Sequence, residues 1–355
     1  MQTPSQNLPV GRYFDCLPRG SPSQPQGVIQ CRLCPRCCRL PDGELGRCGV
    51  RGNRGGMGNL PYYAFITALA VDPIEKKPLY HFNPGSSILS LGFAGCNLHC
   101  PFCQNWHISQ RTDVPGQYCA PADLIATAQA EASPQIAYTY SEPLVHTEYL
   151  LDCMARAHES GLTNVLVSNG CIQIEAAQAV LSLTDAVNVD LKCFSEDTYR
   201  RVLGGDLSTV LTFIKTAWEM GVHLELTTLV VPELNDSDGE IDRCIAFLVG
   251  LSKDIPWHLS AYHPAYQWNA PPTDASRLRS IARRARNTLS YVYTGNLQGE
   301  ANDTPCPQCG RPLVQRHGYH VNTKGLIFKK AENTSSVYCS YCGSPAPIVM
   351  KRNLL

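Results

Sequence analysis

Short apolar runs alternate with longer amphipathic stretches along the middle of the chain. A bounded run of about four to eight apolar residues is typical of a buried strand, and apolar positions three or four apart are typical of a helix. The predicted strands are 88–93, 136–140, 163–168, 186–191, 223–230, 257–262 and 291–294. The predicted helices include 122–131, 144–159, 208–220, 238–251 and 275–288. This alternation predicts an α/β fold with parallel strands and outer helices.

The pattern leaves an open sheet and a barrel as alternatives. In both, catalytic groups gather where parallel strands end at their carboxyl edges. The chain has 355 residues, of which 44% are hydrophobic, enough for one large domain with small additions. We expect a cytoplasmic protein, because the sequence starts without an apolar signal-like run and nowhere contains about 18 consecutive apolar residues.

The 18 cysteines are unevenly placed along the chain. Thiols stay reduced in the cytoplasm, so grouped cysteines favour metal binding over disulfides. Three groups stand out: Cys31, Cys34, Cys37, Cys38 and Cys48; Cys96, Cys100 and Cys103; and Cys306, Cys309, Cys339 and Cys342. The scattered cysteines are interpreted as small buried apolar side chains: Cys16, Cys119, Cys153, Cys171, Cys193 and Cys244.

The charges are also uneven, although the formal net charge is zero. Residues 31–56 carry six arginines against one aspartate and one glutamate, and residues 306–355 carry seven lysines and arginines against Glu332. Two basic, cysteine-bearing segments therefore flank an acidic central part. Such segments can attract an acidic partner.

The string GFAGCNLHCPFCQNWH follows the first predicted strand and spaces Cys96, Cys100 and Cys103 as CxxxCxxC. A cubane iron–sulfur cluster normally takes four thiolates. Three close thiolates can hold one face of the cube and leave the fourth iron open to a small ligand. A zinc ion is the alternative, with His99 or His107 as a fourth ligand.

At these residues the sequence resembles the radical S-adenosylmethionine (SAM) superfamily, whose signature is CxxxCxxC with an aromatic residue, here Phe102, before the third cysteine. The resemblance implies a partial (β/α)6-type barrel and a [4Fe-4S] cluster that binds SAM. It also implies reductive cleavage of SAM to a 5′-deoxyadenosyl radical, which abstracts hydrogen from a substrate. An external electron donor is then required.

Residues at the later strand ends extend this resemblance. Glu142 in YTYSEPL matches the glutamate of a family motif that meets the SAM amino group, and Ser168 and Asn169 in VSNG match a further SAM contact. Each also has a purely structural interpretation. Glu142 could cap the helix near Pro143, and Asn169 with Gly170 could form a turn.

The next two strand ends add Asp190 and Lys192 in NVDLK and His263 in SAYHP, which resemble SAM-site residues of glycyl-radical activating enzymes. Those enzymes carry an aspartate where this chain has Val167, so the resemblance does not extend to their complete cation site. The structural alternative for Asp190 and Lys192 is a surface ion pair. The ordered occurrence of these residues at consecutive strand ends favours the SAM interpretation.

Further motifs resemble the radical SAM component of the AmmeMemoRadiSam system, a relative of the pyruvate formate-lyase activating enzyme. They are CRLCPRCCRLPDGELGRCGVRGNRGG, KPLYHFNPGS, VVPELND, IPWHLSAYHP, YVYTGN and PCPQCGRPL. The implied domains are a Cys-rich N-terminal segment over 1–80, the core barrel over 81–299 and a zinc-ribbon-like module over 300–355. The resemblance gives no settled substrate.

Both flanking segments are predicted to bind metal. In the C-terminal module, two CxxCG motifs about 30 residues apart predict a site formed by Cys306, Cys309, Cys339 and Cys342, for zinc or a rubredoxin-like iron. In the N-terminal segment, Cys31, Cys34, Cys38 and Cys48 suit either zinc or a second iron–sulfur cluster, with Cys37 as a spare. Redox-active thiols are the alternative there.

Three functions follow for comparison. The favoured one is a radical SAM enzyme with a macromolecular substrate, expected to be a protein. The second is an activase that installs a glycyl radical on a partner enzyme, and the third is a non-catalytic metal scaffold or electron carrier. A scaffold has no need of the polar residues at the strand ends. Nucleic acid is a less favoured partner, because no RNA-binding motif accompanies the basic segments.

Overall fold

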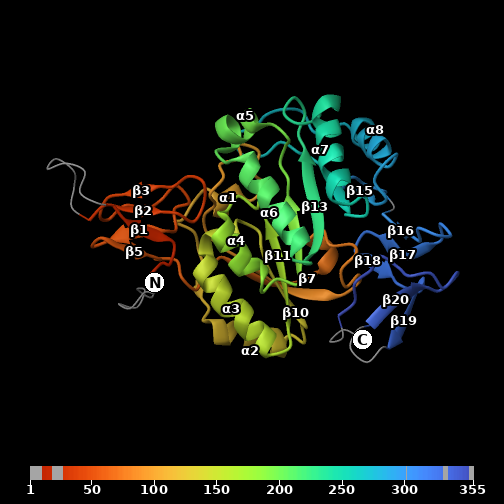
Figure 1. Cartoon of the computed structure of the whole chain (residues 1–355), viewed down its shortest axis with the longest axis horizontal. Coiled ribbons are helices and arrows are strands. Elements are labelled where there is room, and N and C mark those ends of the chain that lie inside the picture. The colour runs from red at the N-terminus through yellow and green to blue at the C-terminus, as the bar shows by residue number, and fades with distance from the viewer. Residues whose placement is uncertain (1–9, 18–26, 301, 331–334, 352–355) are drawn as a thin grey trace.

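In the computed structural model, which describes residues 10–17, 27–300, 302–330 and 335–351, one sheet of eight strands forms the centre (Figure 1). Seven strands run parallel in chain order: β8 (Ser87–Gly92), β10 (Gln135–Thr139), β11 (Thr163–Ser168), β12 (Ala186–Asp190), β13 (His223–Val230), β14 (Trp257–Ala261) and β15 (Val292–Gly295). The seven predicted strands are thus confirmed. The two edge strands, β15 and an additional strand, do not pair with each other. The barrel is therefore open on one side, which is the partial barrel that was expected.

That additional strand, β7 (Ala68–Pro73), pairs antiparallel with β8 and was not predicted. The sheet therefore begins at Ala68, whereas the predicted barrel segment begins at residue 81. The short turn η1 (Ile74–Lys76) follows β7 and leads to β8.

Helices cover the outside of the sheet (Figure 1). They are α2 (Pro121–Ala130), η2 (Pro143–His146), α3 (Thr147–Glu159), α4 (Ile174–Leu181), α5 (Glu196–Thr198), η3 (Tyr199–Leu203), α6 (Leu207–Glu219), α7 (Asp238–Leu251) and α8 (Ala275–Ala285). The last three begin after side chains that accept hydrogen bonds from first-turn N–H groups, namely Asp206, Ser237 and Asp274. The predicted helix 144–159 is divided between η2 and α3.

Short strands build the N-terminal segment, in red and orange at the left of Figure 1. They are β1 (Phe14–Cys16), β2 (Ile29–Cys31) and β3 (Arg39–Leu40) in one sheet, the hairpin of β4 (Gly52–Arg54) and β5 (Met57–Asn59), and β6 (Phe65–Ile66). The last of these pairs with β9 (Gln117–Tyr118), which belongs to the segment between β8 and α2. The segment packs on the barrel through Arg51, whose guanidinium binds both carboxylate oxygens of Glu148 at 2.6 and 2.9 Å.

The C-terminal module, in blue in Figure 1, contains β16 (Thr304–Pro305), β17 (Pro312–His317), β18 (His320–Asn322), β19 (Leu326–Lys330) and β20 (Ser335–Cys339). The buried Arg316 guanidinium donates to the Tyr80 carbonyl at 2.6 Å, and Asn83 N–H donates to the Val349 carbonyl at 2.8 Å. The module is therefore fastened to the segment between β7 and β8.

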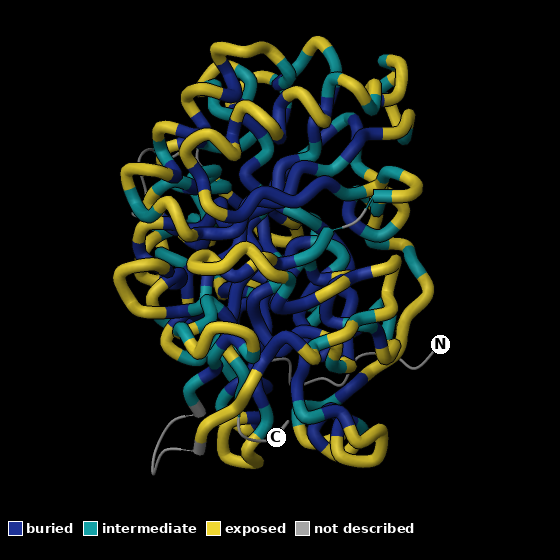
Figure 2. The backbone as a smooth tube through the Cα atoms, turned by 90° about the vertical axis from the view of Figure 1, so that its right-hand side faces the viewer, coloured by how far each residue is buried: buried dark blue, intermediate teal, exposed yellow. Residues whose placement is uncertain are grey.

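The main core lies between the sheet and its helices, and Figure 2 shows the buried residues gathered in the middle of the molecule. Five scattered cysteines are buried, as predicted: Cys119, Cys153, Cys171, Cys193 and Cys244. Cys16 is exposed instead, because it lies on an edge strand of the N-terminal sheet. In the described part of the chain, no helix is long and apolar enough to cross a membrane.

Candidate active site

A cavity opens at the carboxyl ends of the parallel strands, where the fold places catalytic groups. We call it the active-site cavity. Its lining includes these predicted site residues: Cys96, Cys100, Phe102, Cys103, Glu142, Asn169, Asp190 and Lys192. Residues from three different strand ends, those of β10, β11 and β12, and from the cysteine loop therefore meet at one place, as the order of the motifs suggested.

The cysteine loop runs from the end of β8 to the short helix α1 (Trp106–Ser109). Neighbouring elements hold its backbone: His146 Nε2 lies 2.8 Å from the Ala94 carbonyl, and Asn105 Nδ2 donates to the Tyr140 carbonyl at 2.7 Å. Gly95 has φ +80° and donates its N–H to the Ile108 carbonyl. These bonds hold the loop against the segment that follows β10.

The three thiols meet in one cavity but do not form a compact group of ligands for a single ion. All three line the active-site cavity, yet over the residues that the structure describes they form no group of ligand atoms within 4.8 Å of one another. Thiolates on different irons of a cube are farther apart than thiolates that share one ion. His99 bonds Gln110 through Nδ1 at 2.6 Å and joins no such group. The zinc alternative for this loop therefore gains no support.

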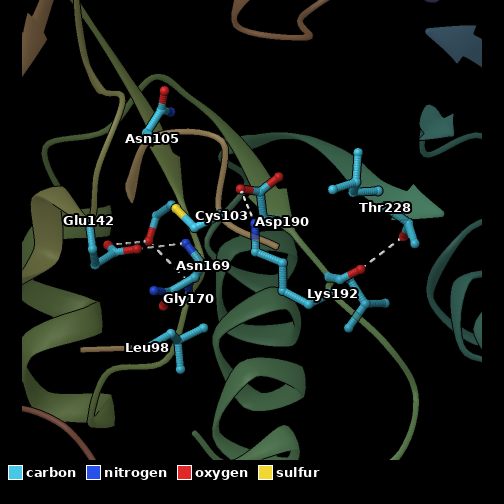
Figure 3. Close-up of polar contacts among 12 residues, drawn as sticks. Leu98, Cys103, Asn105, Glu142, Asn169, Gly170, Asp190, Lys192 and Thr228 are labelled. Carbon is cyan, nitrogen blue, oxygen red and sulfur yellow. Dashed lines mark hydrogen bonds and ion pairs between the residues drawn. The ribbon is translucent and has the colours of Figure 1, made fainter. Parts of the chain in front are cut away.

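Glu142 ends the segment after β10 and is almost completely buried. Its Oε1 accepts from Leu144 N–H at 3.0 Å and from the Ser168 hydroxyl at 2.7 Å, and its Oε2 accepts from Asn169 N–H at 2.8 Å (Figure 3). The helix-cap interpretation is therefore confirmed. Burial raises the pKa of Glu142 to about 7, although these three donors lower it. The same carboxylate also lines the active-site cavity.

Ser168 and Asn169 have different places at the end of β11. Ser168 is buried behind Glu142 and does not line the cavity, so it positions that carboxylate. Asn169 lines the cavity, and its Nδ2 reaches Cys96 Sγ at 3.7 Å. Its Oδ1 also accepts from Cys171 N–H at 2.8 Å, which forms the predicted turn.

Asp190 and Lys192 form an ion pair of 2.8 Å on the opposite wall (Figure 3). Burial lowers the pKa of Lys192, but the nearby Asp190 carboxylate outweighs it and raises the pKa above its ordinary value. Lys192 is therefore cationic at neutral pH. Its ammonium group lies against Asp190, at the carboxylate that the resemblance associated with a cation.

His263 differs from the other predicted residues. It follows β14 but is exposed, and it is not part of the cavity lining. The wall at the end of β14 is formed by Ser260 instead. A contact between His263 and SAM stays a prediction.

Two cavity residues were missed by the sequence analysis. The hydroxyl oxygens of Ser141 and Thr227 are buried, line the active-site cavity, and have no hydrogen-bond partner among the described residues. Buried hydroxyls without partners are rare and indicate a missing ligand or water. With Glu142, Lys192 and Asn169 they offer the mixture of donors and acceptors that the amino, carboxylate and ribose groups of SAM require. The signal in the sequence was the position of Ser141 directly before Glu142.

A second pocket adjoins the active-site cavity and shares Lys76, Pro78, Tyr140, Ser260 and Asn296 with it. We call it the side pocket. Its far wall includes Tyr319 of the C-terminal module, whose ring lies 5.4 Å from the Lys76 ammonium group. The C-terminal module therefore reaches the space next to the strand ends.

The four C-terminal cysteines lie together as predicted and could hold one metal ion. Their Sγ atoms all lie within 4.8 Å of one another, with 3.8 Å both for Cys306–Cys342 and for Cys309–Cys339. Thiolates that bind one zinc ion tetrahedrally at about 2.3 Å are about 3.8 Å apart. Gly310 and Gly343 follow the two motifs with φ +71° and +73°. The spacing fits one ion, whether zinc or iron, in a zinc-ribbon-like module.

The four predicted N-terminal ligands also lie together. Cys31, Cys34, Cys38 and Cys48 line one small cavity, which we call the N-terminal cavity, and Cys37 does not. Their sulfur atoms are not as close together as those of the C-terminal site.

Comparisons with known proteins agree with this geometry. The profile of the Radical SAM superfamily matches residues 91–245. An uncharacterized protein of Methanocaldococcus jannaschii is 36% identical over 91% of this chain and 96% of its own length. The pyruvate formate-lyase-activating enzyme of Clostridium pasteurianum is 23% identical over 48% of this chain and 73% of its own.

Among solved structures, Streptococcus suis SuiB bound to precursor peptide SuiA is similar with a TM-score of 0.49 and 14% identity, over 63% of this chain and 52% of that one. The profile match covers the cysteine loop and the ends of β10, β11, β12 and β13, and the archaeal relative matches nearly the whole chain. The chain therefore belongs to the radical SAM superfamily and is a radical SAM enzyme related to activating enzymes.

Proposed function

We propose that this enzyme binds a [4Fe-4S] cluster through Cys96, Cys100 and Cys103 and binds SAM in the active-site cavity, to generate a radical for hydrogen abstraction from a protein. The observation that carries the proposal is the single cavity that these thiols share with polar residues from consecutive strand ends. When bound there, the cluster would supply the electron that cleaves SAM to methionine and a 5′-deoxyadenosyl radical.

The chain's own residues would then bind and orient SAM. Lys192 presents a cation suited to the SAM carboxylate, and Glu142 presents an acceptor suited to its ammonium group. Asn169 and the hydroxyl groups of Ser141 and Thr227 add neutral partners. The buried aromatic ring of Phe102 closes the wall beside the thiols and limits the access of water.

A protein substrate is supported by the side pocket. It continues the active-site cavity past Tyr140 towards Asp72, Lys76 and Lys77, and its far wall is supplied by Tyr319 of a basic appended module. A small metabolite does not need such a module beside the strand ends. The activating enzymes among the relatives act, by their names, on other proteins.

Two narrower assignments belong to the same proposal. The first is membership of the AmmeMemoRadiSam system, supported by motifs distributed from residue 31 to residue 343. The second, alternative assignment is a glycyl-radical activase, supported by the relatives with that activity in their names. Those two relatives match about half of this chain, whereas the archaeal relative extends over both flanking modules. We therefore favour the first.

The proposal also includes the compartment, the electron donor, the C-terminal ion and the partners of the enzyme. We propose a cytoplasmic protein that receives electrons from an external donor, with zinc in the C-terminal site, and without a nucleic-acid partner. The C-terminal ion would be structural, because its four protein thiolates leave no open position.

The test is an anaerobic incubation of reconstituted, reduced protein with SAM, followed by measurement of 5′-deoxyadenosine. We expect slow formation without substrate and none in Cys100→Ala, whereas Cys119→Ala, at a buried cysteine outside the cavity, should behave as wild type. Cell lysate separated by size should stimulate formation only through its macromolecular fraction. Wild-type turnover in Cys100→Ala would overturn the cluster assignment, and stimulation by the small-molecule fraction would overturn the protein substrate.

A further inference from the structure

The N-terminal cavity is enclosed by four thiols and by cationic side chains. Besides Cys31, Cys34, Cys38 and Cys48, its lining includes Arg36, Arg47 and Arg51. Cys37 is excluded because its backbone has φ +45° and its thiol turns to the Cys34 carbonyl. Four of the five cysteines therefore face the N-terminal cavity. Four is the number of thiolates that a cubane cluster uses.

The spacing of the four sulfur atoms argues against a single ion. Over the described ranges, only the C-terminal cysteines bring three or more such ligand atoms within 4.8 Å of one another. The N-terminal four are more widely spaced although they share one cavity, as are Cys96, Cys100 and Cys103 in the active-site cavity. The same chain thus contains a narrow thiol site for one ion and two wider thiol sites, one of which carries the superfamily's cluster motif.

Arg51 supplies an independent indication of a ligand. Its side chain is 1% exposed, and both terminal nitrogens bind Glu148. Its Nε is buried without a hydrogen-bond partner among the described residues, and the side chain lines the N-terminal cavity. A cluster with four thiolates is anionic, so its sulfur atoms would provide the missing acceptor and balance the arginines.

The N-terminal cavity lies next to the active-site cavity. Asn97 lines the N-terminal cavity, while its chain neighbours Cys96 and Leu98 line the active-site cavity. Arg36 Nε donates to the Asn97 carbonyl at 3.4 Å, and Asn169 Nδ2 donates to Asn97 Oδ1 at 3.0 Å. The backbone of Cys48 packs so closely on Gly95 that an added Cβ would lie 2.3 Å from the Cys48 oxygen. One residue therefore separates the two cavities, and electron tunnelling is fastest over such short separations.

We propose that Cys31, Cys34, Cys38 and Cys48 bind a second [4Fe-4S] cluster, which relays single electrons to the cluster at Cys96, Cys100 and Cys103. A reduced one-electron carrier protein of the ferredoxin class gives one electron to the N-terminal cluster and is itself oxidised. The N-terminal cluster then passes this electron to the active-site cluster and returns to its oxidised state. The relay rests on the proposed function, whereas the presence of the N-terminal cluster does not.

The first experiment measures iron and acid-labile sulfide in the full chain carrying C96A, C100A and C103A together. These changes leave the N-terminal cysteines intact. We expect roughly four sulfides and four cluster irons per chain, and a cluster spectrum; the C-terminal ion contributes no sulfide. Absence of sulfide, or one zinc in its place, would overturn the second cluster. In the complementary variant C34A and C48A, roughly four sulfides should remain. If the variant with C34A and C48A contains no sulfide while the variant with C96A, C100A and C103A keeps its sulfide, the proposed function is overturned instead.

The second experiment compares two reductants by freeze-quench electron paramagnetic resonance of the active-site cluster. With reduced ferredoxin, the reduction rate in C34A and C48A should fall by roughly tenfold relative to the rate with dithionite. The matched control C37A should keep the wild-type ratio of the two rates. An unchanged ratio in C34A and C48A, with the N-terminal sulfide lost, would overturn the relay.

Discussion

The carboxylate of Glu142 accepts a hydrogen bond from the backbone N–H of Asn169 and so ties the end of β10 to the end of β11. With the donors from Leu144 and Ser168, this bond makes Glu142 both a structural anchor and part of the cavity wall. The two functions can be separated by experiment, because stability and SAM affinity are measured independently.

We expect Glu142→Ala to lower the free energy of unfolding by about 2–4 kcal/mol, since it leaves three buried donors without an acceptor. SAM affinity should fall as well. Ser168→Ala is the control for SAM affinity, because Ser168 lies outside the cavity lining; it removes a donor to Glu142 and the acceptor of the Gly170 N–H and should cost about 1–3 kcal/mol. Urea unfolding and equilibrium dialysis with SAM provide the two measurements. Loss of stability with unchanged SAM affinity would limit Glu142 to its anchoring function.

Lys192→Met should weaken SAM binding by roughly tenfold or more while the cluster spectrum is retained, because the ammonium group faces the ligand space and is not an iron ligand. Lys215→Met removes a lysine from the exposed face of α6 and should leave SAM affinity unchanged. The binding isotherms of the two variants decide the point. Equal affinities would contradict a contact between Lys192 and SAM.

The barrel strands were predictable because they are short runs rich in β-branched and other apolar residues, as in TNVLVS of β11 and AVNVD of β12. The strands of the N-terminal segment contain two or three residues each, too few for any periodicity to be detected. β7 was missed for another reason. Its sequence ALAVDP is partly exposed at the sheet edge and ends in Asp72 and Pro73.

The candidate site was predictable as a set of positions but not as a set of contacts. Motif order placed Glu142, Asn169, Asp190 and Lys192 at strand ends, and the cavity unites them. The direction of a side chain after a strand depends on the local backbone and packing, and the sequence does not contain this information directly. For that reason Ser168 lies behind Glu142 and His263 lies outside the cavity lining.

Acid should destabilise the protein through His81. This side chain is fully buried between Pro347 and Tyr293, and burial lowers its pKa to about 3. Below pH 6.5 the unfolded chain therefore takes up a proton that the folded chain does not, so stability falls as the pH decreases towards 3. The slope from this residue approaches about 1.4 kcal/mol per pH unit.

The check is urea unfolding of wild type and His81→Asn between pH 7 and pH 5. Asparagine keeps a donor for the Pro347 carbonyl but cannot titrate. The variant should be less stable at pH 7 and less sensitive to acid. Glu142 acts in the opposite sense, because its raised pKa favours the protonated folded state and reduces stability as the pH rises from 4.5 to 7. If the free energy of unfolding depends on pH in the same way in both proteins, His81 is not a cause of the loss of stability in acid.

Gly95→Ala should displace the N-terminal segment from the cysteine loop. The new methyl group would lie 2.3 Å from the Cys48 carbonyl oxygen, in addition to the strain at φ +80°. Gly43→Ala is the control, since it has φ +85° but no atom within 4 Å of an added Cβ. Faster hydrogen exchange across residues 45–54 is therefore expected in Gly95→Ala and not in Gly43→Ala. Equal exchange in both variants would mean that backbone strain, and not the close contact, determines the effect.

Removal of the C-terminal metal should unfold that module locally while the barrel keeps its structure. The small core of the module, formed around Leu313, Val314 and Val337, cannot stabilise it alone, and metal binding supplies folding free energy in sites of this kind. Chelator treatment or Cys309→Ser should therefore release the ion and reduce hydrogen-exchange protection in β17, β19 and β20 by roughly tenfold or more. Exchange at the carboxyl ends of β11 and β12 should not change, because the ion pair of Lys351 with Asp185, which joins the module to these strands, lies at their other ends. Cys16→Ser, at the exposed scattered cysteine, is the matched control. Full protection of β17 and β20 in a metal-free chain, verified by elemental analysis, would show that the four thiols are not needed to hold the module together.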